Sequence, residues 1–262
     1  MSQFFNAQGL RLAFETHGSG EPLILIHGYP LTRVIWHPLL ASLKGVQAIL
    51  PDVRGFGESE GAAPGFGMEE LAADVNALLD HLQIERAFLA GHSMGGYIAL
   101  AFARRYPQRV KGLALIASQA AADPPERRAA RLETAERIAR EGVTFVAESM
   151  SQALTPDESL RRLLFTLIAR QHPQALIAAL HAMAQRPDSL AVLQSGEFPL
   201  LLVHGQADSL IPLARAQEIR AAVPRARLIE LPGVGHMPMM EAPQRTAQAL
   251  QAWIYGDESQ NG

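Results

Sequence analysis

A serine that could act as a nucleophile, Ser93, stands in the run GHSMGG at residues 91–96. An apolar run at 87–90 precedes it, and an Ala-rich helical pattern follows it. A serine on such a strand-to-helix turn has a strained backbone, and glycine two positions before and after it avoids collisions with the strand and the helix. The start of the helix would also direct free N–H groups and a positive dipole toward the serine, where negative charge develops in acyl transfer. The run therefore predicts a nucleophilic serine.

A serine hydroxyl near neutral pH needs a neighbouring imidazole that removes its proton. Of the nine histidines, His236 lies in the Gly-rich run GVGHMP at 233–238, between the last apolar run and the final helical pattern. There an imidazole could lean over the edge of a sheet. His27 and His92 lie in motifs but flank the reacting atoms, so we expect them to shape loops by hydrogen bonding. These observations favour His236 as the general base.

Two further runs accompany the serine turn: HGYP at residues 27–30, after the apolar run 23–26, and DVRGFGES at 52–59. With GHSMGG and the late Gly-His pair, they occur in the order typical of α/β-hydrolases. The sequence thus resembles the α/β-hydrolase superfamily along nearly the whole chain, except for one inserted segment. This resemblance implies that the backbone N–H groups of Tyr29 and Met94 form an oxyanion hole.

The resemblance also points to the acid of a catalytic triad. Asp208 follows the apolar run 200–203 on the loop that carries this acid in the family, in the chain order Ser, Asp, His. The acid would orient the imidazole and stabilise it once protonated. Asp52 belongs to a loop before the nucleophile, and Asp123 is expected to cap a helix. We therefore predict Ser93, Asp208 and His236 as the catalytic residues.

The elements that must position these residues follow from the spacing of apolar side chains. Six short runs rich in Ile, Val and Leu read as buried parallel strands, and residues 4–16 read as an N-terminal hairpin. The predicted fold class is α/β: a mostly parallel eight-stranded sheet with helices on both faces and an inserted helical cap. Between 117 and 198 the strand pattern gives way to about four helices. We predict a core of 1–118 and 197–262 and a cap of 119–196.

Composition excludes several classes of function. The chain has 23 basic and 26 acidic residues, so its net charge of −3 gives no support to binding of nucleic acid or of a membrane surface. It has no cysteine, no signal-peptide pattern and no apolar run long enough to cross a bilayer, which favours a cytoplasmic protein. Scattered histidines and the absence of a Gly-rich dinucleotide motif disfavour metals and nucleotide cofactors. We expect no cofactor, and a monomer or small homo-oligomer.

The function expected from these features is cleavage of carboxylic esters by a carboxylesterase-type serine hydrolase. The inserted segment offers few obvious polar groups, so uncharged acyl groups of short to medium length are expected. Candidate residues of the pocket wall are Trp36, Met237 and Phe165, the first two because they flank motifs. The small-molecule substrate would be an ester or a lactone.

Three other functions remain open at this stage. Enol-lactone hydrolases share the GHSMGG-like turn, and cofactor-free perhydrolases have an early loop that resembles HGYPL at 27–31, although they usually have Phe where this chain has His92. A non-enzymatic alternative is a small-molecule receptor on a hydrolase scaffold, since fold does not determine function.

Overall fold

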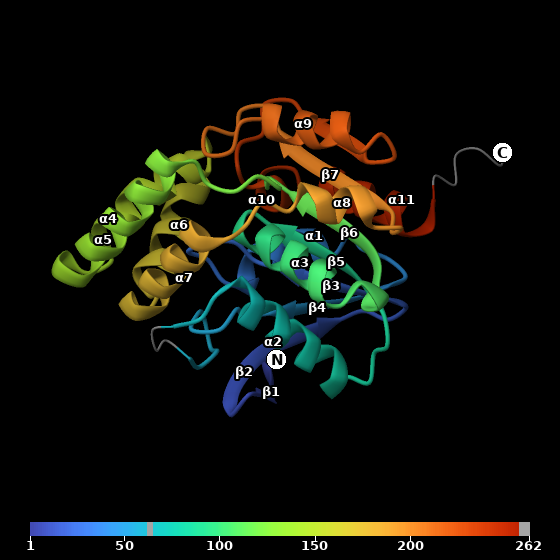
Figure 1. Ribbon diagram of the computed structural model, residues 1–262, viewed down its shortest axis with the longest axis horizontal. Helices are drawn as coiled ribbons and strands as arrows, with labels where there is room; N and C mark the ends of the chain where they lie inside the picture. Colours follow the sequence, from blue (N-terminus) through green and yellow to red (C-terminus); the bar gives the residue numbers. More distant parts are fainter. Residues whose placement is uncertain (62–64, 257–262) are drawn as a thin grey trace.

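The computed structural model describes residues 1–61 and 65–256, which contain one eight-stranded sheet in the order β1-β2-β4-β3-β5-β6-β7-β8 (Figure 1). The pairs β1–β2 and β2–β4 are antiparallel, and all other neighbours are parallel. The predicted fold class is confirmed. The strands are β1 (Gln3–Ala7), β2 (Leu10–His17), β3 (Glu21–Ile26), β4 (Val46–Pro51), β5 (Ala87–His92), β6 (Val110–Ile116), β7 (Leu200–Gly205) and β8 (Arg227–Leu231).

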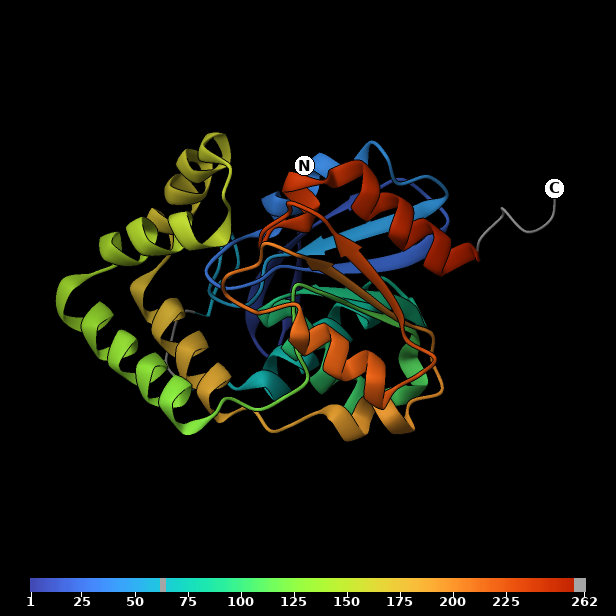
Figure 2. The same cartoon turned by 90° about the horizontal axis from the view of Figure 1, so that it is seen from above.

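Helices cover both faces of the sheet, which is why its central strands read as continuous apolar runs. Every residue of β5 and β7 is buried. One face is covered by α2 (Met68–His81), α3 (Met94–Arg105), α8 (Leu190–Ser195) and α9 (Ala214–Ala222), and the other by α1 (His37–Leu40), α10 (Pro238–Glu241) and α11 (Pro243–Tyr255) (Figure 2). Short 3-10 helices lie at η1 (Arg33–Trp36) and η2 (Pro107–Arg109).

Four of the five helices between β6 and β7 lie beyond the carboxyl ends of the parallel strands, to the left of the sheet in both views (Figures 1 and 2). Among these four, α4 packs against α7, and α5 packs against α6. They are α4 (Pro125–Glu141), α5 (Thr144–Leu154), α6 (Glu158–Ala169) and α7 (Pro173–Gln185). The fifth helix, α8, instead packs against α3 and α9, so the end of the predicted insertion lies with the helices that cover the sheet. No helix in the described ranges is long and apolar enough to span a membrane.

Candidate active site

The turn between β5 and α3 holds Ser93 in a backbone conformation that a non-glycine residue rarely adopts. Its φ is 51° and its ψ is −113°. Hydrogen bonds fix both sides of this residue: the Ser93 N–H donates to the Ile116 carbonyl (2.9 Å), and the Ser118 hydroxyl donates to the Ser93 carbonyl (2.8 Å). The Ser93 hydroxyl itself has no hydrogen-bond partner among the described residues. It is therefore free to meet a bound molecule.

Three glycines allow the backbone to pass close to this turn. A Cβ atom at Gly91 would lie 2.2 Å from the Gly95 carbonyl oxygen, and one at Gly95 would lie 2.2 Å from the Ile26 carbonyl oxygen. Real Cβ atoms do not approach backbone so closely, so both positions require glycine for the reason predicted from the sequence. At Gly28 a Cβ atom would lie 2.6 Å from the His92 ring and 3.0 Å from the Ser93 Cβ. The loop after β3 thus runs directly beside Ser93.

Asp208 and His236 are brought together from the loops after β7 and β8. The His236 Nδ1 lies 2.7 Å from the Asp208 Oδ2, and both side chains are buried. The other carboxylate oxygen accepts the backbone N–H groups of Leu210 (2.9 Å) and Ile211 (3.0 Å). Burial alone would raise the pKa of Asp208, but hydrogen bonds from His204 and His236 hold it well below its ordinary value.

The ionised state of Asp208 determines which nitrogen of His236 carries the proton. An ionised carboxylate can only accept hydrogen bonds, so Nδ1 of His236 must be the donor. In the neutral imidazole, Nε2 is then the unprotonated nitrogen. His236 and Ser93 line the same cavity. The geometry therefore presents a basic nitrogen and a free hydroxyl to one space.

Two residues hold the loop that carries His236. The Glu241 carboxylate accepts the N–H groups of Gly235 (2.8 Å) and Met237 (3.0 Å), the neighbours of His236 on either side. His92 donates from Nε2 to the His236 carbonyl (2.8 Å), and the two rings lie in tilted contact, with centroids 4.9 Å apart and planes inclined by 58°. Glu241 is the last residue of α10, and its carboxylate binds the loop that carries His236.

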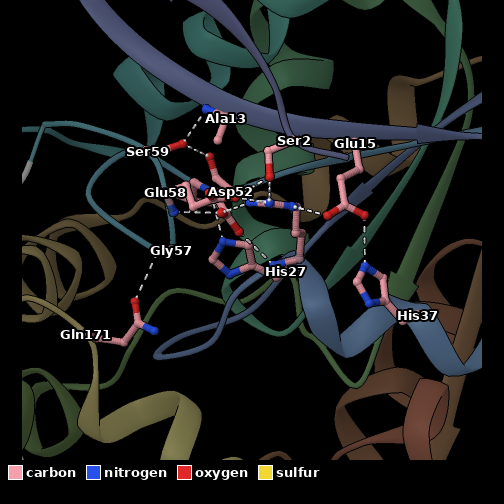
Figure 3. A network of polar contacts seen from close by, with 12 residues as sticks. Ser2, Ala13, Glu15, His27, His37, Asp52, Gly57, Glu58, Ser59 and Gln171 are labelled. Carbon is pink, nitrogen blue, oxygen red and sulfur yellow. Dashed lines mark hydrogen bonds and ion pairs between the residues drawn. The ribbon is translucent and has the colours of Figure 1, made fainter.

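A network of hydrogen bonds joins the loop after β3 to the loop after β4 (Figure 3). His27 donates from Nδ1 to the Gly28 carbonyl (3.0 Å), and its Nε2 accepts the Val53 N–H (2.9 Å). The buried Asp52 carboxylate accepts the backbone N–H and the guanidinium of Arg33. Asp52 thus connects the loop after β4 to η1. The expectation that His27 and His92 shape loops by hydrogen bonding is confirmed.

The N–H groups of Tyr29 and Met94 have no partner within the described part of the chain. Met94 opens α3, so its N–H has no acceptor inside the helix. Tyr29 follows Gly28 on the loop that passes Ser93, and its N–H donates to no described acceptor. Both groups are therefore free to bind an oxygen atom beside Ser93.

A cavity of about 660 Å³ opens onto Ser93 and His236. Its walls come mainly from α4, α5 and α7, with Tyr29 and Tyr97 from the core. The expectation of few polar groups on these walls is wrong, because the wall carries three arginines and a glutamate. The charged and apolar lining residues include Arg127, Arg131, Arg137, Glu148, Phe145, Met150, Leu180, Met183, Leu210 and Ile211.

None of the three predicted pocket-wall residues lines this cavity. Trp36 is fully buried in the core, where its ring packs edge-on against His92. Met237, the residue that caps the start of α10, is also fully buried. Phe165 is 37% exposed on α6, on the solvent side of that helix. Neighbourhood in the sequence did not reveal which way these side chains point.

A second cluster of polar side chains was not predicted from the sequence. The Glu15 carboxylate lies 3.0 Å from the His37 Nε2 (Figure 3). The same carboxylate lies 2.8 Å from the His17 Nε2, and Arg33 donates to its other oxygen. Histidines on a strand and a helix, twenty residues apart, gave no spacing signal. Among the described residues, Glu15, His17 and His37 form the only group of three histidine, cysteine or carboxylate side chains whose ligand atoms lie close enough together to hold one metal ion.

Comparison with known proteins agrees with this architecture. The family profile for the alpha/beta hydrolase fold matches residues 21–161. A solved structure of a thermophilic esterase from Thermogutta terrifontis superimposes with a TM-score of 0.89 and 36% identity, over 97% of this chain and 98% of that one.

Two curated relatives are similar in sequence along most of the chain. One is the dihydrolipoyllysine-residue acetyltransferase component of the acetoin cleaving system of Pseudomonas putida, which is 36% identical over 92% of this chain; the chain spans only 65% of that protein. The other is the pimeloyl-[acyl-carrier protein] methyl ester esterase of Aromatoleum aromaticum, which is 30% identical over 89% of this chain and 98% of the relative.

Proposed function

The chain belongs to the α/β-hydrolase family, and from that premise we propose that it is a serine esterase that cleaves carboxylic esters through an acyl-enzyme intermediate. One observation carries the proposal. Ser93 stands on a positive-φ turn in the same cavity as His236, whose Nδ1 is bonded to the ionised Asp208. Two similar proteins that are named esterases support it, one by structure and one by sequence.

In the first half of the reaction, Nε2 of His236 removes the proton from the Ser93 hydroxyl while the oxygen attacks the ester carbonyl. The carbonyl oxygen becomes negatively charged, and the N–H groups of Tyr29 and Met94 stabilise that charge. The positive end of α3 adds to this stabilisation. Asp208 keeps the proton of His236 on Nδ1 and stabilises the imidazolium.

Collapse of the tetrahedral intermediate breaks the bond between the carbonyl carbon and the alcohol oxygen. The imidazolium of His236 gives its proton to the departing alcohol, which leaves the acyl group on Ser93. A water molecule then attacks the acyl-enzyme and loses its proton to His236. The acid is released, and Ser93 recovers its proton from the imidazolium.

Helices α4–α7 act in this proposal as a cap that sets acyl-group preference without supplying the chemistry. Their residues form most of the cavity wall, whereas Ser93, Asp208 and His236 follow strands of the sheet. A cavity of about 660 Å³ is in the usual range for small-molecule sites and has room for acyl groups of short to medium length.

The test is covalent labelling of Ser93 with a fluorophosphonate, followed by intact mass spectrometry. One adduct per chain is expected in the wild type and none in Ser93→Ala. With a p-nitrophenyl ester, Ser93→Ala and His236→Ala should each lose several orders of magnitude in kcat. Asp208→Asn should lose somewhat less, up to about 10⁴-fold, because it acts through His236. An adduct that survives Ser93→Ala would overturn the assignment.

Substrate assays separate the esterase from its alternatives. Purified protein would be tested on activated esters, lactones and a peracid assay under the same conditions. Turnover of lactones far above esters would replace the esterase by a lactonase, and dominant perhydrolysis would indicate a perhydrolase. Single-turnover hydrolysis with tight product retention would indicate a receptor.

A further inference from the structure

The cavity wall beside Ser93 carries an excess of positive charge. Arg127, Arg131 and Arg137 come from α4, and Glu148 is the one acidic side chain among the lining residues. Glu148 is exposed, so water screens its charge. Arg137 is neutralised by Glu141 at 2.8 Å and stacks on the Phe145 ring. The unbalanced charge therefore lies on the first half of α4.

Behind this wall, one buried carboxylate is shared by three guanidinium groups. Asp123 is bonded to Arg131 and to Arg186 (2.9 Å), and the Arg127 Nε lies 3.7 Å from it. Burial alone would raise the pKa of Asp123, but hydrogen bonds from Arg186 and Arg131 keep it below its ordinary value. Three positive charges thus meet one negative charge. The expectation that Asp123 caps α4 is wrong, because Pro124 stands at the cap position and the carboxylate is occupied by arginines.

The guanidinium of Arg131 is fixed by one ion pair, and some of its N–H donors have no acceptor among the described residues. Its side chain is only 13% exposed, and it bonds Asp123 through Nε. Among the described residues, its two terminal nitrogens have no acceptor. Arg127 donates from both terminal nitrogens to the Leu210 carbonyl, at 3.2 and 3.3 Å, so it too is positioned at the wall. Two guanidinium groups one helical turn apart are therefore presented to the cavity.

Tyr29 adds an unsatisfied donor to the same wall. The residue is 7% exposed, and its hydroxyl has no partner among the described residues. A buried hydroxyl without a partner is costly, so the structure leaves a place for an acceptor. Arg131 lines the same cavity as Tyr29. Burial raises the pKa of Tyr29, although the charge of Arg131 acts in the opposite direction. The hydroxyl keeps its proton and can donate.

We propose that Arg131, Arg127 and the Tyr29 hydroxyl form a subsite for a carboxylate at the far end of the substrate's acyl chain. The preferred substrates are then half-esters of dicarboxylic acids, instead of the uncharged esters expected from the sequence. A carboxylate is planar and accepts hydrogen bonds on both oxygens, which suits guanidinium groups and a phenolic O–H. This inference rests on the proposed esterase activity.

The experiment compares two substrates of the same length: the monomethyl ester of adipic acid and its terminal primary amide. Wild-type protein should show a kcat/KM at least tenfold higher for the anionic ester. Arg131→Gln and Arg127→Gln should each lower this preference about tenfold or more. The matched control is Arg128→Gln, which makes the same charge change at an exposed position of α4 outside the cavity and should retain the preference.

Adipate itself provides a second measurement that needs no turnover of the half-ester. It should inhibit hydrolysis of a neutral ester competitively in the wild type, and about tenfold more weakly in Arg127→Gln. Thermal unfolding of each variant shows whether it is folded. Because Arg131→Gln also removes a bond to Asp123, Arg127→Gln keeps the test valid if the Arg131 variant does not fold.

A wild-type ratio near one between the kcat/KM values of the anionic ester and the amide would overturn the subsite. An equal loss of this preference in Arg128→Gln would also overturn it, because it would indicate a long-range electrostatic effect of the net charge of α4. In either case, fluorophosphonate labelling of Ser93 and hydrolysis of the neutral ester would leave the proposed esterase standing. Failure of Ser93 labelling would instead remove the esterase and the subsite together.

Discussion

At the scale of single residues, the fully buried His27 and His92 form hydrogen bonds as neutral imidazole rings. His27 both donates and accepts, which only a neutral imidazole can do. Burial lowers the pKa of His27, and burial together with the charge of His236 lowers that of His92 well below its ordinary value. Protonation of either ring in the native state would put a charge beside the reacting groups.

This burial predicts a pH dependence of stability. In the unfolded chain each histidine takes up a proton near its ordinary pKa of about 6.5, whereas the native chain keeps both rings neutral. The free energy of unfolding should therefore be highest above about pH 6.5 and should fall as the pH drops, by up to about 2.7 kcal/mol per pH unit for two groups. Urea unfolding between about pH 7.5 and 5 measures this.

His92→Phe removes one of the two groups. Between about pH 6 and 5, the free energy of unfolding of this variant should fall less steeply with pH than that of the wild type, by up to about 1.4 kcal/mol per pH unit. The depressed pKa of Asp208 acts in the same direction but only at lower pH, because that stabilisation is lost below the unfolded value of about 3.9. Equal slopes in the variant and the wild type would contradict this account.

At the scale of elements, the loop between β8 and α10 is held by a carboxylate rather than by side-chain packing alone. Glu241 receives both N–H groups that flank His236, and the N–H of His236 itself donates to the Leu154 carbonyl of α5 (3.0 Å). A loop fixed at three successive N–H groups can place its imidazole with little freedom. Glu241 is thus a positioning residue that touches no reacting atom.

Glu241→Ala should lower kcat about ten- to a hundredfold, because a displacement of about 1 Å at a catalytic group can cost that much. Labelling of Ser93 by a fluorophosphonate should slow in parallel, since it also depends on His236. Glu241→Gln should recover part of both rates, because its amide oxygen can still accept. The control is Glu218→Ala on α9, an exposed glutamate paired with Arg215, which should leave both rates unchanged. A merely structural role would lower the melting temperature while sparing the labelling rate.

At the scale of the whole molecule, helices α4–α7 are tied to the core at several points around the cavity. Gln171, after α6, accepts the Gly57 N–H of the loop after β4 (3.2 Å; Figure 3). The Ser209 hydroxyl donates to the Ala153 carbonyl of α5 (3.3 Å). The two ends of the inserted segment are joined by the Ser189 N–H, which donates to the Ala120 carbonyl (2.9 Å). The cap can therefore define the size of the cavity without contributing a side chain to the triad.

Shortening a lining side chain of the cap should change acyl preference and little else. Met150→Ala on α5 enlarges the cavity and should shift relative kcat/KM toward longer acyl chains by about 1–3 kcal/mol, the range given by a hydrophobic contact. A series of p-nitrophenyl acetate, butyrate and octanoate measures the shift. Phe165→Ala, an exposed residue outside the cavity, is the control. If Met150→Ala abolishes Ser93 labelling and leaves the preference unchanged, the cap belongs to the catalytic machinery.

The sequence by itself determined the features that depend on local constraints. The turn at Ser93 could be predicted because a positive-φ serine between strand and helix demands glycine at positions 91 and 95. The strands could be predicted because parallel strands covered on both faces must be apolar throughout. The prediction that Asp208 and His236 act with Ser93 needed the order of motifs in a known family, and their catalytic roles remain a prediction.

Only the tertiary structure decided what lines the cavity. Trp36 and Met237 stand beside motifs in the sequence, yet both point into the core. In the sequence, Arg127 and Arg131 cannot be told from ordinary charged residues on the surface of a helix. They line the cavity because α4 packs against α7, and the ion pair between Asp123 and Arg186 joins the two ends of the inserted segment. The direction of a side chain depends on which distant elements pack around it. No local pattern records that information, so the charge of the pocket could be read only once the helices were assembled.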